Sequence, residues 1–119
     1  MSPKQLLCAF TQFTGTEHYY RIHPKVVLTD GAKFLSEEAG AYWLMDVIGS
    51  HLCLLNSEEY FTSCTLKVSG QSAKFLMDDG NGKVLAQQYI PHTDFPLPSI
   101  QLYGVWSDSY WVIMLPSEN

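Results

Sequence analysis

Apolar positions recur with a helical period in the first half of the chain. A serine and a proline at residues 2–3 fit an N-cap followed by proline at the first helical position, and the apolar spacing after them predicts a helix over residues 3–13, ending by Gly15. Residues 32–55 are again helical in period, with Gly40 between two apolar stripes. Because glycine weakens a helix by about 1 kcal/mol relative to alanine, we expect either two helices that meet near Gly40 or one bent helix.

From residue 60 onward the period changes to alternation between apolar and polar positions, which is typical of strands with one buried face. The sequence DDGNGK at residues 78–83 is the clearest hairpin signal, since its Gly and Asn residues tolerate positive φ. The predicted strands are residues 60–69, 73–77, 83–90, 100–106 and 110–115.

Residues 19–23 and 26–29 are short and rich in aromatic or β-branched side chains, with Pro24 between them. They are either two small strands or one extended segment broken at the proline. The fold class is therefore α+β: N-terminal helices pack on one face of an antiparallel meander of about five strands, within one domain over residues 1–119.

Composition favours a folded domain that leaves apolar surface for a partner. Hydrophobic residues make up 46% of the 119 residues and aromatic residues 13%, whereas charged residues are only 16%. A typical soluble domain has about 25% charged residues. Sparse charge with many aromatics allows an apolar patch that another molecule covers. A homodimer through a low-charge aromatic sheet face is one such arrangement.

The charge pattern argues against direct nucleic-acid binding. The net charge is −5, and the seven basic residues are scattered along the chain. A protein that binds phosphate backbones needs clustered lysine and arginine, which this sequence lacks.

Cysteine use and the absence of long apolar runs predict a cytoplasmic protein. Cys8, Cys53 and Cys64 are odd in number and widely spaced, so they form neither a disulfide framework nor a zinc motif. No run reaches the roughly 18 apolar residues of a membrane helix, and the N-terminal run is too short for a signal peptide. We expect no contact with a membrane.

The sequence EHYYRIHP at residues 17–24 concentrates the residues most suited to chemistry. In one regular strand, His18 and His23 would point to opposite faces, so the two could not bind one metal ion. The commoner role is a framework strand, in which Arg21 forms a salt bridge to Glu17 or Asp30. The alternative is a pocket built from Tyr20, Arg21, His23 and Asp30, in which the arginine holds a carboxylate or phosphate.

A loop rich in proline, PHTDFPLP at residues 91–98, offers a second candidate. His92 and Asp94 could act as a general base and its orienting carboxylate, but no nucleophile motif accompanies them. A stiff recognition loop with Phe95 and Leu97 as apolar anchors is favoured over catalysis, and a plain connection is the simplest alternative.

Aromatic residues gather in the last predicted hairpin, where Trp106 and Tyr110 are candidates for an exposed binding face. Elsewhere, His51 lies on an apolar helical stripe, where a satisfied core histidine is expected. Phosphate-loop and dinucleotide motifs are absent, and DDGNGK fails the calcium-loop pattern because Met77 and Gln88 fall at ligand positions. We therefore predict no catalytic residues, no metal and no cofactor.

Residues 13–48, FTGTEHYYRIHPKVVLTDGAKFLSEEAGAYWLMDVI, resemble a family of small uncharacterised bacterial proteins. The shared features are FTGTE, paired tyrosines followed by arginine, a valine pair before TDG, and AGAYWL. The resemblance implies a single compact domain, often carried on mobile elements such as plasmids and phages. It implies no activity and no catalytic residues.

Two hypotheses follow. The first is a non-enzymatic, acidic interaction protein that binds and modulates another protein; a mobile-element inhibitor of a host defence system, of the anti-CRISPR type, is one form that the resemblance suggests. The second is a small enzyme or ligand-binding domain with the pocket around Tyr20, Arg21, His23 and Asp30. The second requires those side chains to converge in one concave site.

Overall fold

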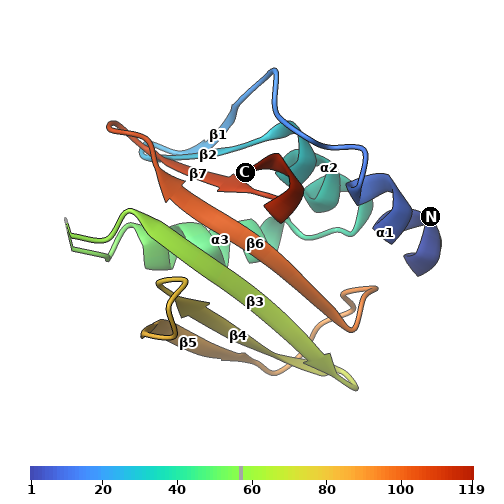
Figure 1. Cartoon of the computed structure of the whole chain (residues 1–119). Coiled ribbons are helices and arrows are strands. Elements are labelled where there is room, and N and C mark those ends of the chain that lie inside the picture. The colour runs from blue at the N-terminus through green and yellow to red at the C-terminus, as the bar shows by residue number, and fades with distance from the viewer. Residues whose placement is uncertain (57) are drawn as a thin grey trace.

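The computed structural model describes residues 1–56 and 58–119. Its seven strands form one sheet in the order β1-β2-β7-β6-β3-β4-β5 (Figure 1). The helices are α1 (Pro3–Phe10), α2 (Asp30–Glu38), α3 (Tyr42–Leu52) and the short 3-10 helix η1 (Pro116–Glu118). The strands are β1 (Tyr20–His23), β2 (Val26–Leu28), β3 (Phe61–Ser69), β4 (Ser72–Asp78), β5 (Val84–Ile90), β6 (Ser99–Trp106) and β7 (Trp111–Met114).

The α+β class is confirmed, but the predicted antiparallel meander of five strands is wrong in three respects. The strands do not all pair in chain order, because β6 pairs with β3 and not with β5. β1 and β2 form an antiparallel hairpin that extends the sheet to seven strands. This hairpin joins through β2, which runs parallel to β7, with Val27 opposite Val112. Local alternation predicted the β3–β4, β4–β5 and β6–β7 hairpins correctly. The pairings of β3 with β6 and of β2 with β7 join residues far apart in the sequence and leave no local signal.

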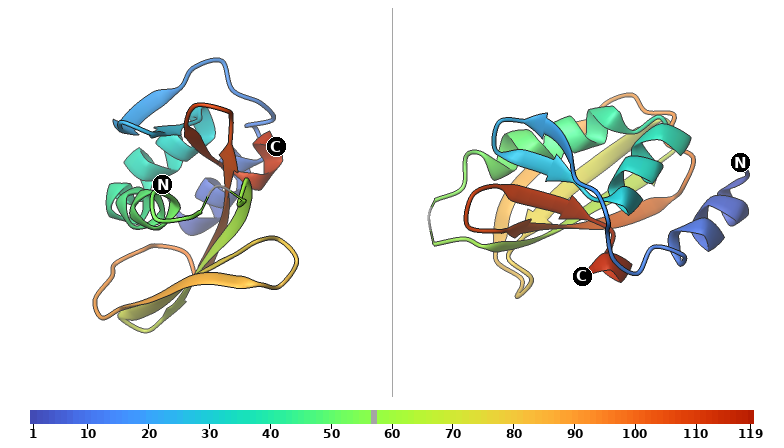
Figure 2. Two further views of the ribbon diagram at one scale, coloured as in Figure 1. Left: turned by 90° about the vertical axis from the view of Figure 1, so that its left-hand side faces the viewer. Right: turned by 90° about the horizontal axis from the view of Figure 1, so that it is seen from above.

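The helices α2 and α3 lie together on one side of the sheet, and α1 packs beside α2 (Figure 2). Not every helix is N-terminal, because η1 follows β7 at the far end of the chain. The core lies between the two layers. Its largest fully buried side chains include Leu35, Leu44 and Ile48 from the helices and Leu66 and Phe75 from the strands.

Capping decides where the helices begin and end. Ser2 and Gln5 form the reciprocal capping box at the start of α1, but the helix ends at Phe10 rather than at the predicted residue 13. Two helices meet near Gly40, as one of the two alternatives predicted. Gly40 has φ +59, a left-handed conformation that ends a helix and that side chains with a Cβ rarely adopt.

The predicted hairpin turn at residues 78–83 is confirmed. Gly80 and Gly82 both have positive φ, and the Asp79 carboxylate accepts hydrogen bonds from the N–H groups of Asn81 and Lys83. These bonds lower the pKa of Asp79, with the Asn81 N–H as the largest cause. Among the described residues, no helix is long and apolar enough to cross a bilayer.

Candidate functional site

The pocket predicted around the EHYYRIHP segment does not form as a single site. The Tyr20 hydroxyl donates to Asp30 Oδ1 at 3.0 Å, so these two side chains do meet. Arg21 is exposed and donates to the carbonyl of Pro24; among the described residues it forms neither of the predicted salt bridges. His23 lies elsewhere, with Nε2 at 3.5 Å from Asp46 on α3.

The two histidines contact different carboxylates, but not through the regular alternation that the sequence suggested. The register of β1 against β2 shifts between Arg21 and His23. The His23 ring consequently lies against α3, where a Cβ built on Gly49 would sit 3.1 Å from its Cδ2 atom. His18 instead lies with Nδ1 at 3.7 Å from Asp30 Oδ1.

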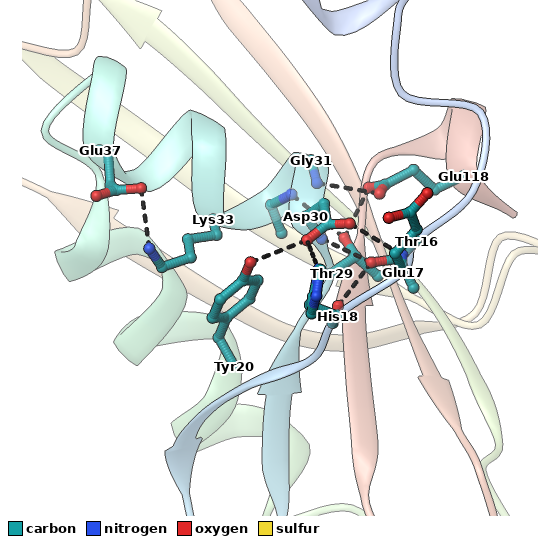
Figure 3. A network of polar contacts seen from close by, with 11 residues as sticks. Thr16, Glu17, His18, Tyr20, Thr29, Asp30, Gly31, Lys33, Glu37 and Glu118 are labelled. Carbon is teal, nitrogen blue, oxygen red and sulfur yellow. Dashed lines mark hydrogen bonds and ion pairs between the residues drawn. The ribbon is translucent and has the colours of Figure 1, made fainter.

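Asp30 is the centre of a polar network that ties the segment before β1 to the start of α2 (Figure 3). Its Oδ2 atom accepts from the Glu17 N–H at 2.9 Å, and its own N–H donates to Thr16 Oγ1 at 2.8 Å. The Glu17 N–H is the main cause that lowers the pKa of Asp30. The same carboxylate raises the pKa of Tyr20, because it accepts a hydrogen bond from the protonated hydroxyl.

Glu118, which the sequence gave no reason to select, brings a second carboxylate to the same helix end. Its Oε1 accepts from Thr29 Oγ1 at 2.6 Å and from the Leu115 N–H at 3.0 Å, while Oε2 accepts from the Gly31 N–H at 3.0 Å. A carboxylate at a helix N-terminus is stabilised by the unpaired N–H groups and the helix dipole. Glu118 thus fastens η1 to α2. We call the Asp30 and Glu118 contacts together the carboxylate network.

The carboxylate network serves the framework. Every carboxylate oxygen of Asp30 and Glu118 accepts at least one hydrogen bond from within the chain. Thr29 Oγ1 also accepts from the Ala32 N–H, which makes Thr29 the N-cap residue of α2. Lys33 Nζ forms an ion pair with Glu37 Oε1 at 3.1 Å and lies 4.7 Å from the centre of the Tyr20 ring. These acids and bases have internal partners, so they hold structure together.

The loop predicted for recognition turns its apolar residues inward. Phe95 is 5% exposed and Leu97 is 2% exposed, so both belong to the core and are not anchors for a partner. His92 and Asp94 are exposed beside a shallow hollow that they share with Gln71 and Thr93. The loop is fixed by the hydrogen bond from the Thr93 N–H to the Gln71 carbonyl at 2.8 Å.

A groove with a tryptophan wall opens where α3 ends, next to the β6–β7 turn. It has a volume of about 340 Å³. Trp106 and Trp111 lie edge to face with ring centres 5.5 Å apart. We call this site the tryptophan groove; it is lined by Lys25, Leu52, Cys53, Leu55, Asn56, Glu59, Trp106 and Trp111.

An open hollow of about 610 Å³ adjoins the tryptophan groove and shares Glu59 and Trp106 with it. We call it the acidic hollow; it is lined by Glu58, Glu59, Tyr60, Phe61, Asp79, Gly80, Asn81, Val105 and Trp106. Three carboxylates and three aromatic side chains stand in this lining, and no basic residue does. Glu59 has a cationic neighbour in Lys83, at 3.4 Å. Tyr60 is 71% exposed, so much of this aromatic surface faces solvent.

A family model, described as a family of unknown function (DUF6876), matches residues 4–119. The chain belongs to this family. The match covers the carboxylate network, the tryptophan groove and the acidic hollow, so all three lie within the DUF6876 domain. Searches of curated proteins and of solved structures gave no significant match.

The other candidate residues of this DUF6876 domain occupy ordinary structural positions. Tyr110 is half-buried in the β6–β7 turn, where its carbonyl accepts from the Ser107 N–H at 2.9 Å. His51 stacks on Phe75 with ring centres 5.6 Å apart, and its Nε2 lies 2.9 Å from Gln88 Oε1. Within residues 1–56 and 58–119, no three His, Cys, Asp or Glu side chains gather in a way that could hold a metal ion.

Proposed function

We propose that this DUF6876 domain is a non-enzymatic protein that binds and modulates another protein, and that a basic segment of the partner binds in the tryptophan groove and the acidic hollow. The observation that carries the proposal is the continuity of these two concavities through Trp106 and Glu59. An apolar groove with an adjoining charged rim is the usual composition of a protein-binding surface.

The tryptophan groove suits an apolar anchor from the partner. Leu52, Leu55 and the two tryptophans give it a mainly apolar lining, and its volume of about 340 Å³ matches one large side chain with room for its neighbours. Tryptophan leads the residues whose truncation weakens protein interfaces most, since its large flat surface excludes water at low entropic cost.

The acidic hollow selects the charge of the partner. Glu58, Glu59 and Asp79 place negative charge beside aromatic rings, and a lysine or arginine can both pair with the carboxylates and lie over a ring. Aromatic faces attract cations by about 0.5–1 kcal/mol at exposed sites. An anionic partner would be repelled, both locally and by the net charge of −5.

The alternative, a small enzyme or ligand-binding domain around Tyr20, Arg21, His23 and Asp30, finds less support. It requires these side chains to converge, yet Arg21 and His23 lie apart from the Tyr20–Asp30 contact. The pKa shifts of Tyr20 and Asp30 follow from hydrogen bonds that the carboxylate network needs for its own structure. A role against a host defence system, carried on a mobile element, stays a prediction from the resemblance.

The test is affinity capture from the native host with three tagged proteins: wild type, Glu58→Lys and Glu38→Lys. Both glutamates are exposed, and only Glu58 lines the acidic hollow. We expect a stoichiometric protein with a basic segment on wild type and on Glu38→Lys, and at least a tenfold loss on Glu58→Lys. Binding should weaken as salt rises, because exposed charges are screened.

Capture that is equal on all three proteins would overturn the assignment of this surface. Reproducible absence of any stoichiometric partner would overturn the function itself. Cys53 supplies an independent readout, because its exposed thiol lines the tryptophan groove. A bound partner should slow its alkylation, while the exposed Cys8 on α1 should react at an unchanged rate.

A further inference from the structure

The two edges of the sheet differ in how they are protected against pairing with another strand. An edge strand presents unpaired N–H and C=O groups, and natural proteins shield such edges with charge, proline, bulges or short length. β1 carries all four devices: it has four residues, its register shifts, Arg21 is exposed on it, and Pro24 follows it.

β5, at the opposite edge, is far less protected. Its seven residues, VLAQQYI, include no charged residue and no proline, and β4 is its one neighbour in the sheet order. The only irregularity in its pairing lies near its start, opposite Met77 and Asp78. Val84 is 49% exposed and Tyr89 is 67% exposed, so large side chains on this strand face solvent.

The sequence of β5 is complementary to itself in an antiparallel arrangement. If the two-fold axis passes through Gln87, Gln87 faces its own copy and Ala86 faces Gln88. Leu85 then lies opposite Tyr89, and Val84 lies opposite Ile90. Each pair joins residues of the same parity, so both members point to the same face of the sheet.

Charges near the edge also permit this arrangement. Lys83 would lie opposite Pro91 of the second copy, so no like charges would meet along the seven paired positions. Pairs of an aromatic with an aliphatic residue, as in Leu85 with Tyr89, stabilise a sheet by about 0.2–1 kcal/mol each. The new ladder would add main-chain hydrogen bonds along the outer edge of β5.

We propose that β5 pairs antiparallel with β5 of a second copy, with the axis at Gln87, to form a homodimer with one continuous sheet. The interface is independent of the tryptophan groove and the acidic hollow, which share no residue with β5. A second copy suits this edge better than an unrelated strand, because all seven positions find a compatible partner in the strand's own sequence.

The test measures solution mass by light scattering after size exclusion, from about 10 to 200 μM. Wild type should shift with concentration toward twice its 13.5 kDa mass. Gln87→Lys would bring two ammonium groups together at the axis and should weaken the dimer at least tenfold. Gln71→Lys, the same change in the exposed β3–β4 turn, should dimerise like wild type.

A second measurement keeps the proposal decidable if Gln87→Lys misfolds. In a background of Cys8→Ser and Cys53→Ser, Gln87→Cys should form a disulfide-linked dimer under mild oxidation, since facing Cβ atoms lie about 4.5–5.5 Å apart in a ladder. Gln71→Cys should not. A wild-type mass that stays monomeric over the whole range would overturn the proposal. A dimer that survives Gln87→Lys, with no cross-link through Gln87→Cys, would overturn it equally.

Discussion

The carboxylate network and the acidic hollow both contain carboxylates, but the carboxylates have different roles in the two regions. Asp30 and Glu118 are half-buried, and their carboxylates accept hydrogen bonds from the chain itself. Glu58 stands exposed beside aromatic rings, with no ion pair among the described residues. A carboxylate that is fully hydrogen-bonded stabilises the fold, whereas one left beside exposed aromatic surface is available to a partner. Substitutions in the first region should therefore change stability, and substitutions in the second should change binding.

The largest loss of stability is expected from Gly31→Ala, at the centre of the carboxylate network. A Cβ at this position would come within 2.7 Å of both the Glu118 carboxyl carbon and Leu115 Cδ1, so these two side chains would have to shift and the Glu118 carboxylate would lose its hydrogen bonds to Thr29 and Gly31. Overpacking together with the lost hydrogen bonds should lower the free energy of unfolding by about 2–4 kcal/mol. Urea denaturation measures this free energy. A change within about 0.5 kcal/mol would mean that Glu118 does not fasten η1 to α2.

A smaller loss, with a distinct pH dependence, is expected from Asp30→Asn. The pKa of Asp30 is lowered in the folded protein, so the carboxylate contributes stability above its unfolded pKa of about 3.9 and loses that contribution as pH falls through the lower folded value. At pH 7 the variant should lose about 1–2 kcal/mol.

Below pH 4 the difference between Asp30→Asn and wild type should narrow. Thermal unfolding of the two proteins, measured at intervals from pH 7 to pH 3, gives this difference in stability. A gap that stays constant across this range would show that the charge of Asp30 does not contribute.

The three cysteines allow the core and the tryptophan groove to be compared in the wild-type protein, without a destabilising substitution. Burial raises the pKa of Cys64 to about 12, so its thiol stays protonated, while Cys8 and Cys53 are exposed. Iodoacetamide at pH 8 should modify two cysteines in the native protein and three after denaturation, as counted by intact-mass spectrometry. Modification of Cys64 in the native state would contradict the burial of this β3 residue in the core.

The smallest effects are expected from the candidates that the structure places outside both regions. Arg21→Ala and His92→Ala remove exposed side chains, and each should change the free energy of unfolding by no more than about 0.5 kcal/mol. Partner binding should also stay unchanged. A loss of binding on Arg21→Ala would indicate that the partner binds at β1 and not at the acidic hollow.

The features predicted correctly from the sequence are those that depend on local patterns of residues. The β3–β4, β4–β5 and β6–β7 hairpins followed from alternation and turn residues, whereas the pairing of β6 with β3 did not. Asp30 was predicted either to pair with Arg21 or to belong to a pocket; it is hydrogen-bonded instead to the Glu17 N–H and the Tyr20 hydroxyl, and these bonds serve structure. The burial of Phe95 could not be read from its neighbours, since a proline-rich loop can face either way.

The features that sequence reasoning missed join distant parts of the chain. Glu118 contacts Gly31 across 87 positions, and no periodicity connects the two. The tryptophan groove combines Lys25 before β2, the end of α3, and the β6–β7 hairpin. Trp106 was named as a binding candidate, whereas the residues that turn it into one wall of a groove come from elements whose packing only the fold determines.

The parallel pairing of β2 with β7 sets an order on folding. The β1–β2 hairpin is synthesised before its neighbour in the sheet, Trp111–Met114, which follows it by more than 80 residues along the chain. Contacts between such distant segments slow folding, since a long loop must close before they form. Until then Val26 and Leu28, both fully buried in the finished sheet, stay without their partner strand. The nascent chain therefore carries an exposed, strand-prone segment until β7 has been synthesised, and an exposed segment of this kind is prone to aggregation.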